Sequence, residues 1–450
     1  MCDRAFHLSR YGTKAPETDD TRRVQSAIDD AHKAGGGKVV IPAGEYPCGP
    51  LEMKSGVHLF LEEGARILGV WRDCDRPFKA LIHASGARDI RISGPGVIDA
   101  RGDLETFPDR KGNRPRGLSI HDCGNVAVKD IHFRNSPSWA LVFSLCQDLT
   151  VDNVTVLDHN NYNNDGIDIV DCSRVKITNC DISSDDDGIC LKSFTERGNR
   201  DIEIAHCTVG SHCNAIKTGT ESYGAFRDVH IHDCKVVRAR SEQVWYGNAN
   251  GQSAICITNV DGAALEDIHI HDIEIVSGTR IPIFLKLGAR LRKYGNEAPR
   301  PVGVYRRVTV ERVHSPNSLN SSYACAVAGV KDNGQTHFLE DIALRDIRLH
   351  FIEATEGNTN ATAADTVAEN PAAYPHPNML GDLPAYGLYC RHVKGLQLKN
   401  IRLSCDGAER RPPIVHQDVH GLSLEEINAW YDPRHCEQPV REVGGGGDSG

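Results

Sequence analysis

The feature that most constrains the fold of this 450-residue chain is a short pattern of alternating apolar residues that recurs along it. The pattern reads apolar-x-apolar-x-polar-(Ile/Val/Cys)-x-apolar. Its steps are 23, 26, 27 and 27 residues between Val126, Leu149, Val175, Ile202 and Val229. Alternation with a period of two indicates strands rather than helices. Near-constant steps indicate that each repeat forms one coil stacked on the next.

After Val229 the steps lengthen to 39, 40, 34, 54 and 26 residues, which predicts insertions on some coils. The copies are Val126–Phe133, Leu149–Val156, Val175–Ile182, Ile202–Val209, Val229–Val236, Ile268–Ile275, Ile342–Leu349, Leu396–Leu403 and, more weakly, Val308–Val313 and Leu422–Ile427. We predict an all-β, single-stranded, right-handed parallel β-helix, the hand following from the crossover rule. A propeller would need about four strands per 40–45 residues and a closing repeat.

The N-terminal region predicts a helix that caps the open end of the stack. Residues 18–21 offer Thr and Asp as helix N-caps, and Gly35-Gly36-Gly37 ends the helix. The apolar residues between them recur at helical spacing: Val24, Ile28, Ala31 and Ala34. An uncapped stack exposes strand edges and core. We therefore expect a cap with the first coils over residues 1–80, a catalytic β-helix over 81–440, and a flexible glycine-rich tail over 441–450.

Composition narrows the range of partners. The net charge of −10 and a pI near 6.1 argue against nucleic acid as the main partner. No apolar run approaches the ~20 residues of a membrane span. The first residues lack a signal-peptide core, which predicts a cytoplasmic protein, or a secreted or periplasmic one if an export signal had been removed. The oligomeric state stays open.

The chain contains 16 cysteines without zinc-like Cys-x-x-Cys pairs. Cys180, Cys207 and Cys234 recur at steps of 27 residues inside strand patterns. A cysteine that recurs with the coil is expected to be a small buried packing residue rather than a disulfide partner. Unpaired use of this kind favours a reducing compartment.

Two acidic turns carry the strongest functional signal: Asn163–Gly166, and Ser184–Gly188 on the next coil. Asp165 and Asp186 are 21 residues apart, close to one repeat. Stacked strands lie ~4.8 Å apart, so Asp165, Asp186 and Asp187 should form one patch. Like charges this close are costly unless a site uses them. The alternative is that each Asp caps its own turn, and Asp185 fits that description.

Neighbouring carboxylates suit glycoside hydrolysis, which needs one protonated carboxyl as acid and one ionised carboxylate as base or nucleophile. His212 follows Asp187 by 25 residues and enters its strand at the equivalent place on the next coil. On this face we expect His212 to hold a carboxylate or a substrate hydroxyl.

These elements resemble glycoside hydrolase family 28, the polygalacturonases and their pectin-active relatives. Asn163-Asn164-Asp165-Gly166 is similar to the family's Asn-Thr-Asp-Gly, Asp186-Asp187 to its Asp-Asp pair, and His212 to the histidine of its Gly-His-Gly. Further similarity lies in Gly94–Asp99, in Asn135–Trp139 and in an opening that several pectin-active families share. The resemblance implies that Asp186 is the general acid, that Asp165 and Asp187 activate water, that the anomeric centre inverts, and that no metal or cofactor is needed.

The chain departs from this family at the strand that should carry Arg-Ile-Lys, where it reads Ala254-Ile255-Cys256-Ile257. In the family the basic pair binds the substrate carboxylate. Either other basic residues replace it, or the sugar in that subsite is not galacturonate. The candidate replacements, each alternatively a solvated charge, are Lys192, Lys217, Lys286 and Arg290. Asn163, Trp245 and Tyr246 complete the predicted substrate contacts, with ordinary packing as the alternative for the two aromatic residues.

We therefore expect an exo-acting, inverting hydrolase of pectin-derived oligosaccharides. Polar insertions should border the groove and block part of it: 101–117, 238–253, 287–306 and 351–386. The last of these could instead be a disordered surface loop. The rival functions are a hydrolase of another unit of rhamnogalacturonan or of another polysaccharide, a pectate-lyase-like enzyme that needs calcium, and a non-catalytic β-helix such as an adhesin.

Overall fold

The structure is a computed structural model that describes residues 4–12, 19–71, 80–103, 105–108, 114–245, 247–276, 279–352, 367–407 and 409–444. The chain divides into two compact units. The first comprises Met1–Cys190, Arg200–Cys213 and Ala239–Gly247, and the second comprises Leu191–Asn199, Asn214–Arg238 and Asn248–Gly450. Both units are built from coils of a right-handed parallel β-helix, which confirms the predicted fold class.

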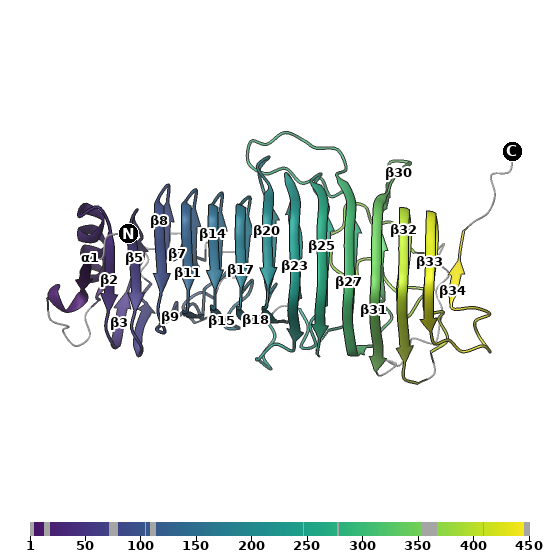
Figure 1. Cartoon of the computed structure of the whole chain (residues 1–450), viewed down its shortest axis with the longest axis horizontal. Helices are drawn as coiled ribbons and strands as arrows, with labels where there is room; N and C mark the ends of the chain where they lie inside the picture. Colours follow the sequence, from purple (N-terminus) through teal and green to yellow (C-terminus); the bar gives the residue numbers. More distant parts are fainter. Residues whose placement is uncertain are drawn as a thin grey trace. The chain divides into compact units, whose positions relative to one another are not determined.

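The first unit has three rows of parallel strands, and each coil contributes one strand to each row (Figure 1). The row that leads into the candidate site contains β4 (Leu51–Glu52), β7 (Ala80–Ser85), β10 (Arg116–His121), β13 (Leu141–Ser144) and β16 (Ile167–Val170). The second row contains β2 (Gly37–Ile41), β5 (Val57–Leu61), β8 (Arg88–Ser93), β11 (Gly124–Lys129), β14 (Gln147–Asp152), β17 (Ser173–Thr178) and β20 (Asn199–Ala205). The third row contains β3 (Gly44–Cys48), β6 (Ala65–Gly69), β9 (Val97–Asp99), β12 (His132–Arg134), β15 (Thr155–Asp158), β18 (Asp181–Ser184) and β21 (Thr208–Ser211). The unit boundary falls inside β19 (Ile189–Ser193).

The register of the coils follows the sequence repeat. Val126 pairs with Leu149, Leu149 with Val175, and Val175 with Ile202. These side chains are buried, whereas their neighbours along the strand point outward. The alternation that predicts strands therefore also fixes which residues of each coil form the core.

The polar position of the repeat is a corner of the coil. Asp130, Asn153 and Asn179 occupy it with φ values of 56°, 53° and 56°. This left-handed conformation is strained for most side chains but tolerated by Asn and Asp. The corners also bond to one another, since Asn153 Nδ2 donates to Asp130 Oδ1 at 2.8 Å.

The predicted capping helix is present as α1 (Thr21–Lys33), preceded by β1 (Ala5–His7) and a 3₁₀ turn at Leu8–Arg10. Figure 1 shows α1 beside β2, at the end of the first unit. Val24, Ile28 and Ala31 are buried, and the Thr21 amide is bound by Asp19 Oδ1 at 2.8 Å.

The second unit continues the repeat with longer strands. One row contains β22 (Asn214–Ser222), β24 (Ser253–Asn259), β26 (Ile281–Leu287), β28 (Cys325–Ala328) and β34 (Val440–Glu442), and the first residues of β32 (Leu388–Cys405) and β33 (Ile414–Ala429) lie between β28 and β34. The outer strands are β23 (Ala225–Val237), β25 (Ala264–Ile275), β27 (Val304–Leu319), β31 (Leu339–Ile352), β32 and β33, with a small hairpin of β29 (Val330–Asp332) and β30 (Gln335–His337). Register again matches the repeat, because Val229 pairs with Ile268, Ile268 with Val308 and Ile342 with Leu396.

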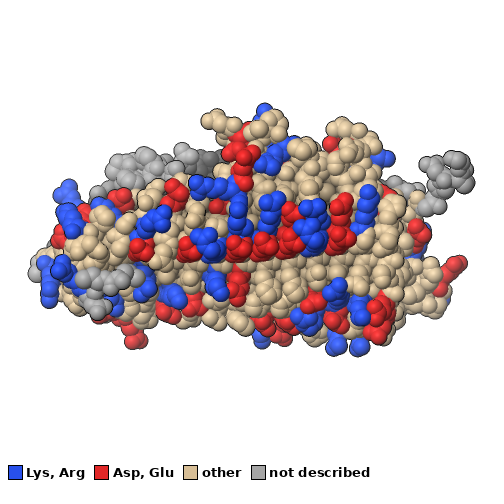
Figure 2. Space-filling model, turned by 45° about the horizontal axis from the view of Figure 1, so that its top comes forward, with Lys and Arg blue, Asp and Glu red and all other residues tan. Residues whose placement is uncertain are grey.

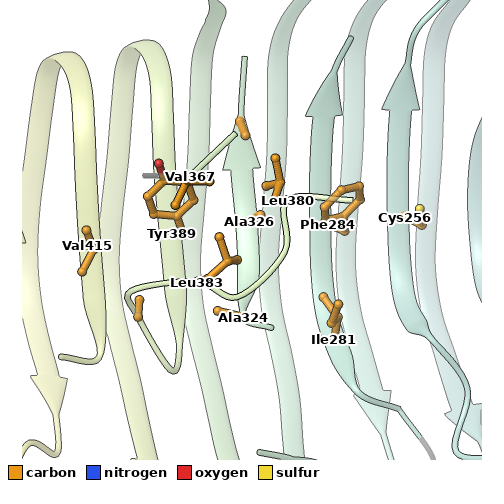
Figure 3. Packing of buried hydrophobic residues seen from close by; sticks show 12 residues of the cluster. Cys256, Ile281, Phe284, Ala324, Ala326, Val367, Leu380, Leu383, Tyr389 and Val415 are labelled. Carbon is orange, nitrogen blue, oxygen red and sulfur yellow. The ribbon is translucent and has the colours of Figure 1, made fainter. Parts of the chain in front are cut away.

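The second half of the 351–386 insertion packs against the row of β26 and β28. Val367, Leu380 and Leu383 are buried against Phe284 and Tyr389 (Figure 3). For the described residues 367–386, a disordered surface loop is therefore the wrong description. Residues 353–366 of the insertion, part of 101–117 and the tail after 444 lie outside the described residues.

Every cysteine in the described ranges has a free thiol, and Cys180, Cys207 and Cys234 are buried as predicted. Among the described residues, no helix combines the length and apolarity that a membrane span requires.

Candidate active site

The two acidic turns follow equivalent strands on adjacent coils of the first unit. Asp158, the last residue of β15, pairs with Ser184, the last residue of β18. Ser184 in turn pairs with Ser211 of β21. The segments that begin at His159, Asp185 and His212 therefore leave the third row at the same corner of three successive coils.

The backbones of the two turns are hydrogen-bonded to each other. The Asp186 amide donates to Asn164 O at 3.2 Å, and the Gly166 amide donates to Asp187 O at 2.9 Å. Gly166 is required by this close approach, because a Cβ there would lie 2.5 Å from Gly188 O. The spacing of 21 residues thus places Asp165, Asp186 and Asp187 on neighbouring coils, as predicted.

Asp186 is the most accessible of the three predicted catalytic carboxylates, with 8% of its surface exposed against 2% for Asp165 and for Asp187. Its Oδ1 accepts the amide of Asp187 at 3.0 Å. Its Oδ2 accepts Nδ2 of Asn163 at 3.3 Å. Asn163 thus contacts the proposed acid directly, whereas its predicted contact with substrate stays a prediction.

Hydroxyl groups beneath the second turn fix its main chain. Ser184 Oγ donates to the carbonyls of Asp186 at 3.0 Å and of Asp187 at 3.2 Å. Ser211 Oγ, from the next coil, donates to the carbonyl of Asp186 at 2.5 Å. The Asp186-Asp187 pair therefore sits on a rigid support, as preorganised catalytic groups require.

An arginine that the sequence reasoning missed lies in line with Asp165. Because Leu118, Leu141 and Ile167 are paired, the residues two places before them, Arg116, Trp139 and Asp165, occupy matching positions on three coils. The Arg116 guanidinium lies 4.8 Å from the centroid of the Trp139 ring. Burial lowers the pKa of Arg116, while the negative charges of Asp168 and Asp165 raise it.

Asp165 and its neighbour Asp168 therefore share one partly desolvated cation. A nearby positive charge favours the ionised carboxylate that a base requires. The signal for Arg116 is available in the sequence only once the register of the coils is known.

His212 is fully buried and contacts Asp185 instead of the predicted catalytic pair. Its Nδ1 lies 2.9 Å from Asp185 Oδ1, and its Nε2 lies 3.0 Å from Ser241 O. Each ring nitrogen of His212 therefore has an oxygen atom of the chain within hydrogen-bond distance. Of the two roles that the sequence left open, the structure gives His212 the holding of a carboxylate, and with 0% exposure the ring does not reach a substrate.

Asp185 also binds residues outside its own turn. Its Oδ1 also accepts the backbone amide of Trp245 at 2.8 Å, from the 238–253 insertion. The Trp245 indole donates to His159 O at 2.7 Å, and its ring meets Tyr162 edge-to-face at 5.7 Å. Trp245 is partly buried by these contacts, and Tyr246 lies outside the described residues.

His159, Asp185 and His212 bring three possible metal-ligand atoms within 4.8 Å of one another. The contacts of His212 leave neither ring nitrogen available, because both face oxygen atoms of the chain. Burial lowers the pKa of His159 to about 3, with further lowering by the charges of His212 and Arg240. Beneath the site, burial raises the pKa of Asp158 well above its usual range. We read this group as a structural network.

The predicted basic residues belong to the second unit, where two of them remain candidates. Lys192 and Lys217 are largely buried. The Lys192 carbonyl accepts Nδ2 of Asn199 at 2.8 Å. The Lys217 ammonium lies 5.6 Å from the ring centroid of Tyr374, a half-exposed residue of the 351–386 insertion.

Lys286 and Arg290 are engaged inside the second unit, which argues against the predicted contact with substrate. Lys286 has 0% exposure, and its Nζ donates to Leu287 O at 2.6 Å and to Gly329 O at 2.7 Å. Burial, aided by the charge of Arg391, lowers the pKa of Lys286 to about 7. Arg290 donates through Nε to the buried Asp261 at 2.9 Å.

Comparison with known proteins places this geometry in a family. Residues 33–275, just over half of the chain, match the family described as Glycosyl hydrolases family 28. An "Endo-polygalacturonase" of Pectobacterium carotovorum subsp. carotovorum is 26% identical over 284 residues, covering 53% of this chain and 68% of that protein. A "Probable rhamnogalacturonase A" of Aspergillus oryzae is 27% identical over 252 residues, covering 55% and 51%.

Among solved structures, the hyperthermoactive exopolygalacturonase from Thermotoga maritima aligns with a TM-score of 0.64 at 20% identity, covering 78% of this chain and 88% of that one. This likeness shows the fold. Together with the family match and the stacked acidic turns, it means that the chain belongs to glycosyl hydrolases family 28 and is a glycoside hydrolase of the polygalacturonase type.

Proposed function

We propose that this enzyme hydrolyses pectin-derived oligosaccharides containing galacturonic acid, from the chain end and with inversion at the anomeric carbon. The observation that carries the proposal is the hydrogen-bonded pair of turns that brings Asp165, Asp186 and Asp187 onto neighbouring coils. A hydrolase needs its acid and its base on the two sides of one glycosidic bond.

In this mechanism Asp186 donates a proton to the leaving oxygen, and Asp165 with Asp187 activates the attacking water. The greater exposure of Asp186 supports its role as the acid, because the acid must meet the glycosidic oxygen directly. Arg116 supports an ionised Asp165, since its charge acts on that carboxylate. His212 acts as a positioning residue that holds Asp185, next to the acid in the chain.

Exo action is supported by the packed part of the long insertion. Residues 367–386 cover the outside of β26 and β28 with buried Val367, Leu380 and Leu383 (Figure 3). A strand row covered by its own chain leaves less room for a polymer along that row of the second unit. Lys217, beside Tyr374 of the same insertion, is the candidate for binding the substrate carboxylate.

The experiment is product analysis on defined oligogalacturonides. Proton NMR during hydrolysis should show the inverted anomer first, and chromatography should show monomers or single small units from the start of the reaction. Asp186→Asn should reduce kcat by at least about 10². Retained anomeric configuration, mixed oligomers at early times, or full activity of the variant would each remove one part of the proposal.

A second candidate is a hydrolase of a rhamnogalacturonan unit other than galacturonate. The observation that favours it is the strand Ser253–Asn259, which is buried throughout and carries no basic side chain at Ala254–Ile257. The Aspergillus oryzae relative is a probable rhamnogalacturonase. Parallel assays on oligogalacturonides and rhamnogalacturonan fragments separate the two, and an absorbance assay for unsaturated sugar would reveal a lyase.

A further inference from the structure

A repeated His-Ile-His-Asp motif on the outside of the second unit places four imidazole rings together. The motif covers residues 230–233 on β23 and 269–272 on β25. His230 pairs in register with His269, and His232 pairs with His271. Because side chains alternate along a strand, all four rings point outward while Ile231 and Ile270 fill the core.

The rings pack in two stacked pairs. His230 and His269 have centroids 5.3 Å apart at an interplanar angle of 9°, and His232 and His271 lie 5.1 Å apart at 11°. The Nε2 atoms of His230 and His271 face each other diagonally at 2.6 Å. Ligand atoms of His230, His269 and His271 all lie within 4.8 Å of one another, and the residues are partly exposed.

Carboxylates contact two of the rings, those of His271 and His269. Asp272 Oδ2 lies 2.6 Å from Nδ1 of His271, which leaves Nε2 as the atom directed at His230. Glu311 Oε1 lies 3.2 Å from Nε2 of His269. A carboxylate on the far nitrogen is the arrangement that fixes the tautomer and orientation of a metal-binding histidine.

Arg312 keeps these carboxylates in a supporting role. Its Nε donates to Asp272 Oδ1 at 2.8 Å, and its Nη1 donates to Glu311 Oε1 at 2.5 Å. Figure 2 shows rows of Lys and Arg side chains beside rows of Asp and Glu side chains on the face in view. Arg312 offsets part of the charge of these two carboxylates, and the imidazole nitrogen atoms are the ligand atoms of the cluster.

We propose that His230, His269 and His271 form a binding site for a divalent first-row transition metal ion, with Zn²⁺ as the reference ion. Imidazole ligands suit Zn²⁺, Ni²⁺ and Cu²⁺, whereas Ca²⁺ and Mg²⁺ prefer oxygen. Zn–N bonds of ~2.0–2.1 Å in a tetrahedral site require the two Nε2 atoms to separate to roughly 3.4 Å, a small rotation for partly exposed rings. The ion would link β23 to β25 and leave a position for water.

The test is zinc binding by the untagged full chain after treatment with a chelator. Calorimetric titration with ZnCl₂ should show one site per chain, and Zn²⁺ should raise the unfolding temperature because it binds the folded state. Ni²⁺ should compete, and excess Mg²⁺ should not. His271→Ala should weaken binding by more than the about 10–100-fold that loss of a supporting group typically costs, because it removes a ligand.

Two matched controls sharpen the test. His314→Ala removes an exposed histidine from the neighbouring strand β27 and should leave zinc binding unchanged. Asp272→Asn should weaken binding by about 10–100-fold through the orientation of His271. Asp267→Asn removes an equivalent pair, between Asp267 of the same strand and Arg307, and should leave zinc binding unchanged. Absence of a zinc site in the wild type, or equal weakening by His271→Ala and His314→Ala, would overturn the proposal.

Discussion

Arg114 and Asn163 are joined by a hydrogen bond of 2.8 Å from Nη2 to Oδ1, and this bond decides which side of the Asn163 amide meets Asp186. A guanidinium can only donate, so the amide oxygen must face it. The amide nitrogen is thereby turned toward Asp186 Oδ2, at 3.3 Å. Arg114 also binds Pro137 O at 2.9 Å and Asn161 Oδ1 at 3.1 Å, which anchors the turn in the preceding coil.

Replacement of Asn163 should therefore affect the proposed acid more than substrate binding. A hydrogen bond between neutral groups contributes about 0.5–1.5 kcal/mol, so Asn163→Ala should lower kcat by roughly 2–10-fold through the position of the protonated Asp186. Asn163→Asp should place a second carboxylate beside Asp186 and move the alkaline limb of the pH–kcat profile to higher pH.

The matched control is Asn153→Ala. Asn153 is also a left-handed Asn that donates to an Asp, Asp130, at 2.8 Å, but on an exposed corner. It should leave kcat unchanged. A rise in KM alone for Asn163→Ala would instead assign the residue to substrate binding, as the sequence first suggested.

Asp185 and His212 should behave as one unit. Both are completely buried, and removal of one partner leaves the other without its hydrogen bond, which typically costs about 1–3 kcal/mol. His212→Ala should lower the free energy of unfolding and kcat together. In Asp185→Asn/His212→Ala the loss of stability should be smaller than the sum of the single losses, as denaturant titrations can measure. Additive losses, or an equal effect of the exposed control His132→Ala, would contradict the pairing.

Much of the fold follows from the spacing of apolar residues. The pairing of Val126 with Leu149 and of Val229 with Ile268 is the register that the repeat predicts. The juxtaposition of the two acidic turns follows as well, because a separation of one coil leaves little freedom. Features that depend on the alternation of apolar residues within one coil can therefore be predicted from the sequence of that coil alone.

The remainder depends on contacts between coils. Arg114 and Arg116 precede the first acidic turn by two coils and acquire their roles only when the coils stack. From the sequence alone, Lys286 is a candidate for substrate binding because a lysine on a strand usually faces solvent. It is buried because residues 367–386 cover its row, so both faces of β26 are hidden and alternation no longer distinguishes inside from outside. A covering segment distant in sequence leaves no local signal.

Arg116 should control the ionisation of the catalytic base. Its guanidinium is partly desolvated beside Asp165 and Asp168, and a neighbouring cation typically lowers a carboxyl pKa by 1–3 units. Arg116→Gln should therefore move the acidic limb of the pH–kcat/KM profile to higher pH by about one unit. Arg91→Gln, at an exposed position of β8, is the control. If the acidic limb does not move, Arg116 has no effect on the ionisation of the base, and its role is limited to packing against Trp139.

Lys286 should make stability depend on alkaline pH. The folded-state pKa of Lys286 is lowered to about 7 by burial and by Arg391, whereas the unfolded chain binds this proton up to ~10.4. Between these values the unfolded state holds more protons, so stability rises with pH, by at most about 1.4 kcal/mol per pH unit.

Below about pH 7 both states carry the charge, and the unfavourable contribution of the buried ammonium reaches its full size. Lys286→Met cannot titrate, so the difference in unfolding free energy between wild type and variant should move in favour of the wild type from pH 7 to 10. Lys235→Met, which removes an exposed lysine paired with Glu274, should show no such trend. Denaturant midpoints at several pH values provide the measurement, and parallel curves for wild type and Lys286→Met would mean that Lys286 stays charged in the folded enzyme.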